Sequence, residues 1–336
     1  MEYLRGVTLT PAASLVPTDE ELGALAEKTR ILCATVAQVL SGKEEVIETT
    51  IAVLLARGHL LLEDVPGVGK TTLATAIGKA LNFTVSRIQF TPDMLPSDLT
   101  GVNIYRNQTG TFDFRPGPLF AQIVIGDEVN RASPKTQSAL LECMQEGQVS
   151  IDGTSHELPS PFFVIATQNP IEMEGTYPLP EAQRDRFTAR IEMGYPSSED
   201  EFEMLGMHEA RRDTSEIQPV LSAQDIEAMT RVAESVYASD LLKQYVIDLV
   251  RATRNHPDLR LGASPRAAIQ LLSMAKVKAA MARRNHVLPQ DVQQLVHPVL
   301  AHRVLPRGSA SDREMSAQVL QQIVDSVPVR IYEPGS

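Results

Sequence analysis

The apolar residues between positions 51 and 193 fall into short runs that alternate with patterns typical of helices. Several runs are almost continuously apolar, as expected for strands that are buried on both faces of a sheet. Helical patterns separate the first run from the second and the third from the fourth. The chain is therefore predicted to have an α/β fold, with a five-stranded, mostly parallel sheet between helices. The runs are "HLLLE" (59–63), "VSRIQF" (85–90), "QIVIGD" (122–127), "FFVIAT" (162–167) and "TARIE" (188–192).

Two segments interrupt this alternation, and both have the pattern of a β-hairpin. Residues 101–114 ("GVNIYRNQTGTFDF") alternate in character around an Asn/Gly turn, and residues 147–158 ("GQVSIDGTSHEL") do so around Asp152-Gly153. They stand just before the third and the fourth predicted core strand. Hairpins of this kind can be decorative loops, but this placement fits a functional role equally well.

After position 196 the pattern becomes almost entirely helical. Ser197 and Asp200 have the spacing of a capping box, and Ser264 followed by Pro265 is typical of a helix start. The sequence therefore predicts three parts, which are a helical lead-in (1–40), an α/β core that contains both hairpins (41–196) and a helical domain (197–336).

The segment "DVPGVGKTT" (64–72) resembles the phosphate-binding loop G-x-x-x-x-G-K-[ST], although the first glycine is missing. Gly67 and Gly69 allow the backbone amides to face phosphate oxygens, and Lys70 supplies a positive charge for the β- and γ-phosphates. The Thr71 hydroxyl can bind Mg²⁺. An apolar strand precedes the segment and a helix follows it, so a nucleotide site is predicted. The residues expected to bind ATP are Pro66, Gly67, Val68, Gly69, Lys70, Thr71 and Thr72.

Polar residues follow two of the other apolar strands. Asp127 and Glu128 end the third run, which directs their carboxylates to the same edge of the sheet as the phosphate loop. An aspartate there suits Mg²⁺, and a glutamate suits a base that activates water. Asn169 follows the fourth run, where an amide can bond both the γ-phosphate and the attacking water. Alone, an Asp-Glu pair is more often a solvated turn, and only its distance from the loop favours catalysis.

The ordered set "DVPGVGKT", "GDEVNRASPKTQSALLECMQEG", "IATQNP", "YPLPEAQRDRF" and "GASPRA" resembles the MoxR family of AAA+ ATPases, in the helix-2-insert group. The resemblance covers about residues 35–305. It implies a P-loop NTPase core of five strands, a C-terminal helical lid, and a ring, usually of six subunits, with ATP between subunits. It also implies that the hairpin at 101–114 is the insert and that the hairpin at 147–158 precedes sensor 1. Such insertions are expected near the pore or the partner-facing surface.

The same resemblance assigns roles to single residues. Lys70 and Thr71 correspond to Walker A, Asp127 and Glu128 to Walker B, and Asn169 to sensor 1. Two departures stand beside them, since Asp64 replaces a glycine and Gly126 weakens the apolar run. Our hypothesis is that the Asp64 carboxylate turns away from the phosphates and pins the start of the turn.

The resemblance also implies a role for two arginines. Arg186 in "RDRF" is the expected arginine finger, which would reach the γ-phosphate of a neighbouring subunit. Arg184 and Arg190 are rivals, and a surface ion pair is a fair alternative for each of the three. Arg266 in "SPRA" corresponds to sensor 2, and whether it acts in its own subunit or in the next stays open. A cation at a helix N-terminus is mildly disfavoured by the helix dipole, so another requirement is expected to hold it there.

Composition narrows the partners. The 336 residues carry a formal net charge of -11 with a pI of about 5.2, and there is no tryptophan, which disfavours nucleic acid as the client. No apolar run is long enough for a membrane span, and the N-terminus has no secretion pattern. Cys33 and Cys143 lie in apolar helical patterns, as expected for reduced thiols in the cytoplasm.

We therefore expect an ATP-hydrolysing remodelling motor that requires Mg²⁺ and acts on protein clients during assembly, activation or metal or cofactor insertion. By resemblance, a separate protein with a von Willebrand factor A domain is the expected partner. A magnesium-chelatase-like motor subunit is the main alternative, and a nucleic-acid-translocating ATPase is disfavoured by the acidic charge. A nucleotide-binding scaffold without turnover is disfavoured because Lys70, Glu128 and Arg266 are all present.

Overall fold

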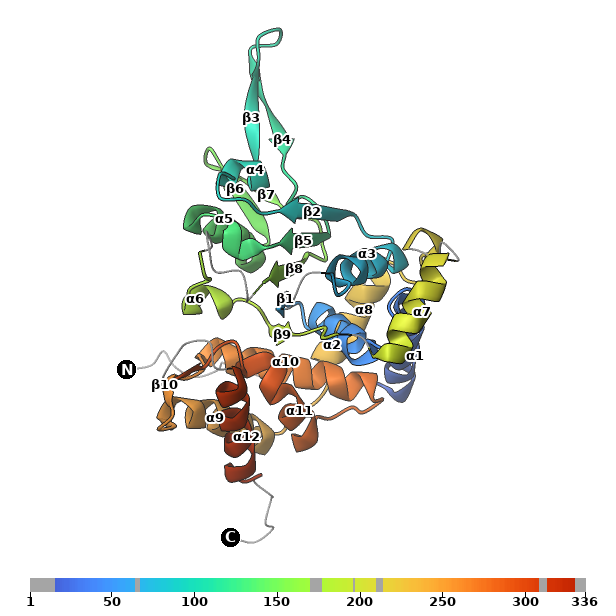
Figure 1. The fold of residues 1–336 in the computed structure, drawn as a ribbon, viewed down its shortest axis with the longest axis vertical. Helices are drawn as coiled ribbons and strands as arrows, with labels where there is room; N and C mark the ends of the chain where they lie inside the picture. The colour runs from blue at the N-terminus through green and yellow to red at the C-terminus, as the bar shows by residue number, and fades with distance from the viewer. Residues whose placement is uncertain are drawn as a thin grey trace, which may run out of the picture.

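Five parallel strands form the central sheet of the computed structural model (Figure 1). The structure describes residues 16–63, 67–169, 177–195, 197–209, 214–307 and 313–329. The strand order is β2-β5-β8-β1-β9, and all four neighbouring pairs are parallel, so the predicted α/β sheet is confirmed. The strands are β1 (Leu60–Glu63), β2 (Val85–Gln89), β5 (Ile123–Asp127), β8 (Phe163–Gln168) and β9 (Ala189–Ile191).

Helices cover both faces of the sheet. Alternate residues of a strand point to opposite faces, and on each face they pack into a different hydrophobic cluster. In β1, Leu60 and Leu62 pack with one cluster and Leu61 packs with the other. The first cluster contains the helices before the sheet, the helix after the phosphate loop and the C-terminal helices; the second contains the helices of the opposite face. The covering helices are α1 (Asp19–Ala37), α2 (Glu44–Leu55) and α3 (Lys70–Ala80) on the first face, and α4 (Pro96–Thr100) and α5 (Pro134–Glu146) on the second.

The C-terminal helices pack below the sheet in Figure 1 and share the first hydrophobic cluster with α1, α2 and α3. Serines begin several of them, as the sequence indicates: Ser222 forms a capping box with Asp225, and the Ser264 hydroxyl accepts the N–H of Ala267. The C-terminal elements are α7 (Ser198–Glu209), η2 (Thr214–Glu216), α8 (Ala223–Glu234), α9 (Asp240–Asn255), β10 (Leu259–Leu261), α10 (Pro265–Met281), α11 (Pro289–Leu300), β11 (Leu305–Pro306) and α12 (Arg313–Ser326). Two short helices, η1 (Val129–Arg131) and α6 (Glu181–Arg184), belong to the core instead. In the parts of the chain that the structure describes, no helix is long and apolar enough to cross a membrane.

Two antiparallel hairpins project from the sheet. The longer, β3 (Gly101–Arg106) with β4 (Thr111–Pro116), forms the narrow extension at the top of Figure 1. The shorter is β6 (Gln148–Ile151) with β7 (Thr154–Glu157), and its turn residue Asp152 has a positive φ of 51°. Asn103 of the longer hairpin donates a hydrogen bond of 2.7 Å to Asp152 of the shorter one. The two hairpins therefore contact each other.

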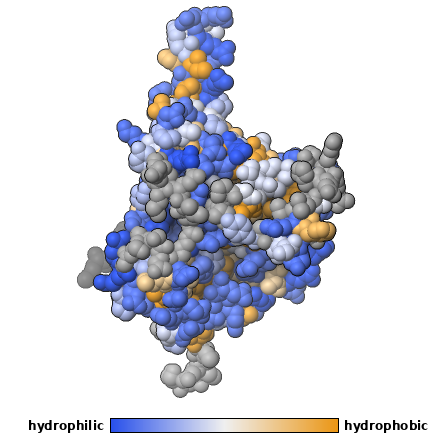
Figure 2. Space-filling view, in the orientation of Figure 1, coloured by the Kyte–Doolittle hydropathy of each residue, from blue (hydrophilic) through white to orange (hydrophobic). Residues whose placement is uncertain are grey.

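The longer hairpin carries exposed apolar side chains, which Figure 2 shows on the projecting part of the surface. Tyr105 is 53% exposed and Phe112 is 69% exposed, and their rings lie 5.1 Å apart between centroids. Val102 and Ile104 are also exposed. The register places Tyr105 and Phe112 on one face of the hairpin and Val102 and Ile104 on the other. Each pair is a small apolar patch, and such patches mark contact sites more often than single side chains do.

His59, at the start of β1, is a buried histidine that stays neutral. Its Nε2 donates to the carbonyl oxygen of Met144 at 2.9 Å, and its Nδ1 accepts the N–H of Val164 at 3.1 Å. Burial lowers the pKa of His59 to about 4. Between that value and the unfolded pKa of about 6.5, the unfolded chain binds a proton that the folded chain does not.

The free energy of unfolding is therefore expected to fall by up to about 3 kcal/mol through this group as the pH drops from about 7 to 4. The variant His59→Gln, which retains a donor and an acceptor, should show a shallower pH dependence in urea unfolding. The exposed His286→Gln is the matched control and should follow the wild type. An unchanged slope in His59→Gln would contradict this assignment.

Candidate nucleotide-binding and hydrolysis site

The phosphate loop needs both of its glycines for backbone reasons. Gly67 and Gly69 have φ values of 87° and 94°, in the region that residues with a Cβ rarely adopt. Gly69 also lies against Leu40, because an added Cβ would stand 3.0 Å from Leu40 Cδ1. Asp64 and Pro66 lie outside the described residues, so the hypothesis about the Asp64 carboxylate remains a prediction.

The helix α3 begins directly after this loop, with Gly69 as its N-cap. Lys70, Thr71 and Thr72 occupy its first turn, where the free N–H groups and the helix dipole favour a phosphate. β1 leads into the loop and lies beside β8, which in turn lies beside β5. The carboxyl ends of these three parallel strands therefore meet at one edge of the sheet.

Asp127 ends β5 at this edge, and its carboxylate forms an ion pair with the Arg87 side chain. Its Oδ2 accepts a hydrogen bond of 2.6 Å from Nε of Arg87 on β2, and its Oδ1 lies 3.3 Å from the hydroxyl of Thr167. The Asp127 side chain is 10% exposed, whereas that of Arg87 is 59% exposed. The Thr167 hydroxyl therefore holds one oxygen of the Asp127 carboxylate inside the protein, and the other oxygen faces the guanidinium of the exposed Arg87.

Glu128 follows in a left-handed backbone conformation, with φ 56°. Its carboxylate accepts a hydrogen bond of 2.8 Å from Nε2 of Gln89 and forms an ion pair with Arg131, with 3.0 Å between Oε2 and Nε. Its backbone N–H donates to the Thr167 hydroxyl at 3.0 Å. Left-handed non-glycine residues are uncommon and concentrate at functional sites, where the surrounding contacts hold them.

Two further residues complete the edge. Asn169 follows β8 directly and is buried. Gly126, which interrupts the apolar run in the sequence, makes room for a neighbour, because an added Cβ would lie 3.0 Å from Cε2 of the buried Phe90. The departure from the apolar pattern is therefore a packing requirement.

The residues at this edge fit a nucleotide with Mg²⁺. In the described residues no group of three His, Cys, Asp or Glu side chains comes together as a metal cluster. Mg²⁺ usually keeps water ligands and uses one or two protein groups together with substrate phosphates, so such a cluster is not needed. The contact between Asp127 and the Arg87 guanidinium indicates that this carboxylate accepts a cation.

The arginines differ in their surroundings. Arg190 lies in β9 and forms an ion pair with Glu63, with 3.1 Å between Nη1 and Oε2 and each side chain 8% exposed. Arg190 therefore forms an ion pair, but a buried one, because the register of β9 beside β1 places the pair inside the protein. Burial also lowers the pKa of Arg184, the last residue of α6. Arg186, two residues on, lines a cavity of about 360 Å³ against α5.

Arg190→Ala is expected to lower the free energy of unfolding by about 3–5 kcal/mol, because the buried Glu63 carboxylate loses its guanidinium partner. Urea unfolding measures this change. Arg231→Ala removes an exposed ion pair on α8 and should change stability by less than about 1 kcal/mol. A loss below about 1 kcal/mol for Arg190→Ala would contradict the structural role.

Arg266 lies near Arg186. Its Nη2 donates to Oε1 of Gln145 on α5 at 3.3 Å, and Gln145 lines the same cavity as Arg186. This bond gives Arg266 a partner despite its unfavourable position in the first turn of α10. The described contacts of Asp127 and Glu128 are instead with β2, β8 and η1. In Figure 1, α5 and α6 lie on the left and α3 on the right.

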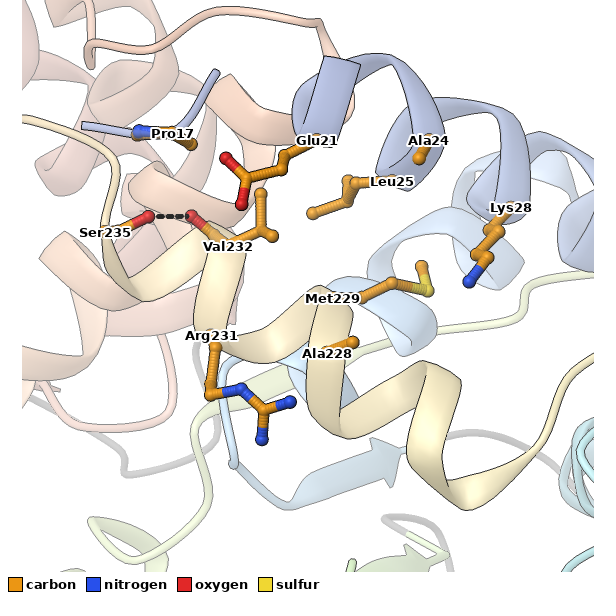
Figure 3. Close-up of a pocket in the computed structure, with 10 residues that line it drawn as sticks. All are labelled: Pro17, Glu21, Ala24, Leu25, Lys28, Ala228, Met229, Arg231, Val232 and Ser235. Carbon is orange, nitrogen blue, oxygen red and sulfur yellow. Dashed lines mark hydrogen bonds between the residues drawn. The ribbon is translucent and has the colours of Figure 1, made fainter. Parts of the chain in front are cut away.

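A second cavity, of about 410 Å³, lies between α1 and α8 (Figure 3). Figure 3 shows Leu25 and Lys28 of α1 facing Met229 of α8 across it. None of the residues predicted to bind nucleotide lines this cavity. A salt bridge of 2.5 Å between Lys28 and Asp225 joins α1 to α8, so the cavity belongs to the packing of the C-terminal helices on the core.

Sequence reasoning missed Arg87 and Gln89 and gave Arg131 no defined role. A signal for the first two is present in "VSRIQF", where polar side chains alternate with apolar ones on a predicted strand. Their partners could not be read from the sequence, because the pairing of β2 with β5 is a property of the sheet order.

Comparison with known proteins places this geometry in a class. Residues 59–189 match the family described as "ATPase family associated with various cellular activities (AAA)", and residues 251–323 match the family described as "AAA lid domain". A solved structure of a candidate ATPase from Cytophaga hutchinsonii superposes with a TM-score of 0.85 at 37% identity, covering 93% of this chain and 98% of that one. The chain is thus an α/β AAA-type core with a lid.

Relatives along nearly the whole chain define the family more closely. The uncharacterized protein YeaC of Bacillus subtilis is 46% identical over 88% of this chain and 92% of its own length. Chaperone MoxR1 of Mycobacterium tuberculosis is 41% identical over 85% of this chain and 78% of its own, and protein MoxR of Paracoccus denitrificans is 32% identical over 79% and 85%. This chain belongs to the MoxR family of AAA ATPases.

Proposed function

We propose that this chain binds ATP with Mg²⁺ and hydrolyses it in a ring of identical subunits, by resemblance a hexamer. The observation that carries the proposal is the convergence, at the carboxyl ends of β1, β5 and β8, of the glycine loop, the Asp127–Glu128 pair and Asn169. Family membership implies nucleotide binding and supports turnover.

In this proposal, the loop amides and Lys70 bind the phosphates and Thr71 and Asp127 hold the metal. When bound, Mg²⁺ neutralises charge that develops on the phosphates. Glu128 orients the attacking water and accepts its proton, and its carboxylate is kept in place by Gln89 and Arg131. Asn169 donates its amide to the γ-phosphate and the water.

Arg186 and Arg266 are proposed to serve the ATP of the neighbouring subunit. Both contact the α5 side of the chain, and their described contacts are separate from those of Asp127 and Glu128. Glu142 and Glu146 also line this cavity. The two arginines can stabilise charge on a γ-phosphate presented from outside, which supports a site shared between copies. In this proposal, Arg266 acts on the ATP of the next subunit.

The work of the motor is proposed to be remodelling of protein complexes, as the name of Chaperone MoxR1 suggests for that relative. Assembly, activation or metal insertion of a complex, with a separate von Willebrand factor A domain partner, remains our proposal by resemblance. The exposed apolar residues of the longer hairpin, Val102, Ile104, Tyr105 and Phe112, are the proposed protein-facing surface. A cytoplasmic location is supported by Cys33 and Cys143, which are both free thiols.

The test is phosphate release from ATP by the purified chain over a range of protein concentrations. The wild type should turn over only with Mg²⁺, and the rate per subunit should rise with protein concentration because the site is shared. Lys70→Ala should lose ATP binding. Absence of Mg²⁺-dependent turnover at every concentration would refute the proposed function.

A further inference from the structure

Arg303, in the segment after α11, touches the backbone on both sides of Arg186. Its side chain is 1% exposed, and its Nη2 lies 3.3 Å from the carbonyl oxygen of Asp185 and 2.5 Å from that of Phe187. Its Nε lies 3.3 Å from Oδ1 of Asp185. One guanidinium therefore holds the residue before and the residue after the proposed finger.

Other residues of the C-terminal domain hold the same short segment. Nε2 of His302 donates to the carbonyl oxygen of Phe187 at 2.9 Å, and burial lowers the pKa of His302, so that the ring is neutral at pH 7. The Ser264 hydroxyl donates to the Asp185 carboxylate at 2.8 Å. The finger segment is thus attached to the lid through at least three side chains.

The chemistry of Arg303 differs from that of an ordinary packing residue. Burial lowers its pKa to about 10, partly offset by Asp185, so the guanidinium is charged at neutral pH. Replacing a buried ion pair by apolar residues of similar size is often neutral or stabilising. Packing of the lid on residues 185–187 would therefore not by itself require a charged side chain at this position. The rigid planar group can, however, place Nη2 against the carbonyl oxygens of Asp185 and Phe187 while Nε faces the Asp185 carboxylate. The same Nη2 also contacts Oε1 of Gln270 on α10.

We propose that Arg303 is a positioning residue for the arginine finger. It holds Asp185 and Phe187 so that Arg186 is directed at the ATP of the neighbouring subunit, and it joins the finger to the lid. A movement of the lid in one subunit is then passed to the finger that the next subunit receives. This inference rests on the proposed shared site.

The direct test is Arg303→Lys, which keeps the charge and removes the rigid planar group that holds Nη2 and Nε in fixed positions. We expect kcat for ATP to fall at least 10-fold while ATP binding to the variant's own phosphate loop is unchanged. The matched control is Arg284→Lys, because Arg284 forms a two-bond ion pair with Asp291 inside the lid and has its described bonds only there. The control should keep kcat within about two-fold of the wild type.

A mixing experiment separates positioning from a general structural effect. Subunits with Arg303→Lys keep a complete ATP site, and subunits with Glu128→Gln keep a complete finger. Mixed rings should therefore recover turnover at interfaces where a Glu128→Gln subunit supplies the finger. Urea unfolding of each variant gives its stability. If Arg303→Lys does not fold, Asp185→Asn is measured in the same mixtures and should behave in the same way.

The inference is overturned if Arg303→Lys keeps wild-type kcat, or if its turnover is not recovered by mixing while Arg186→Ala is recovered. An inactive wild type would instead refute the proposed function. Failure of Arg186→Ala itself to recover would refute the shared site on which the inference rests.

Discussion

Glu128→Gln is expected to reduce the rate of phosphate release by about 10²–10⁴-fold, the usual contribution of a general base. The substitution keeps the size of the side chain and an oxygen that can accept bonds from Gln89 and Arg131, but it removes the basic carboxylate. ATP binding should persist, because the phosphate loop is unchanged. Single-turnover phosphate release and nucleotide binding measure the two effects separately.

The control for this variant is Glu157→Gln in β7, which changes the same functional group on the shorter hairpin. It should leave phosphate release within about two-fold of the wild type. If Glu128→Gln retained full turnover, Glu128 would not be the base.

Arg186→Ala is expected to reduce kcat by about 10³–10⁵-fold, the contribution of arginine fingers in related chemistry. Arg186 lines an open cavity on the α5 side, so its removal should cost little stability. The measurement is kcat together with the affinity for ATP, which should stay close to that of the wild type. Arg231→Ala, an exposed arginine on α8, is the matched control and should keep full activity.

A fall in ATP affinity equal to the fall in kcat would contradict the role of Arg186 in stabilising the transition state. The comparison with Arg190→Ala distinguishes the two arginines. Arg186→Ala should lose turnover while remaining folded. Arg190→Ala should lose stability, because Arg190 pairs with the buried Glu63.

The features that depend on local sequence could be predicted. Continuous apolar runs indicated the parallel strands, because strands buried on both faces have no polar side. Gly67 and Gly69 indicated the loop, and both have the positive φ that only glycine adopts easily. Asp152-Gly153 indicated a hairpin turn, and both residues have positive φ there.

The features that depend on which elements become neighbours could not be predicted. Arg87 meets Asp127 because β2 pairs with β5. Arg190 is buried because β9 pairs with β1. Arg303 reaches Asp185 across 118 positions of sequence, which only the packing of the lid on the core brings about. No local pattern records these contacts, since each is fixed by the tertiary arrangement.

The most direct test of the shared site is to mix inactive subunits. Arg186→Ala subunits contain a complete phosphate loop, Asp127 and Glu128, and Glu128→Gln subunits contain a complete finger. We expect each variant alone to be inactive and mixtures of the two to hydrolyse ATP, with the highest rate at intermediate ratios. Absence of recovery at every ratio, with both variants folded and able to associate, would contradict the account.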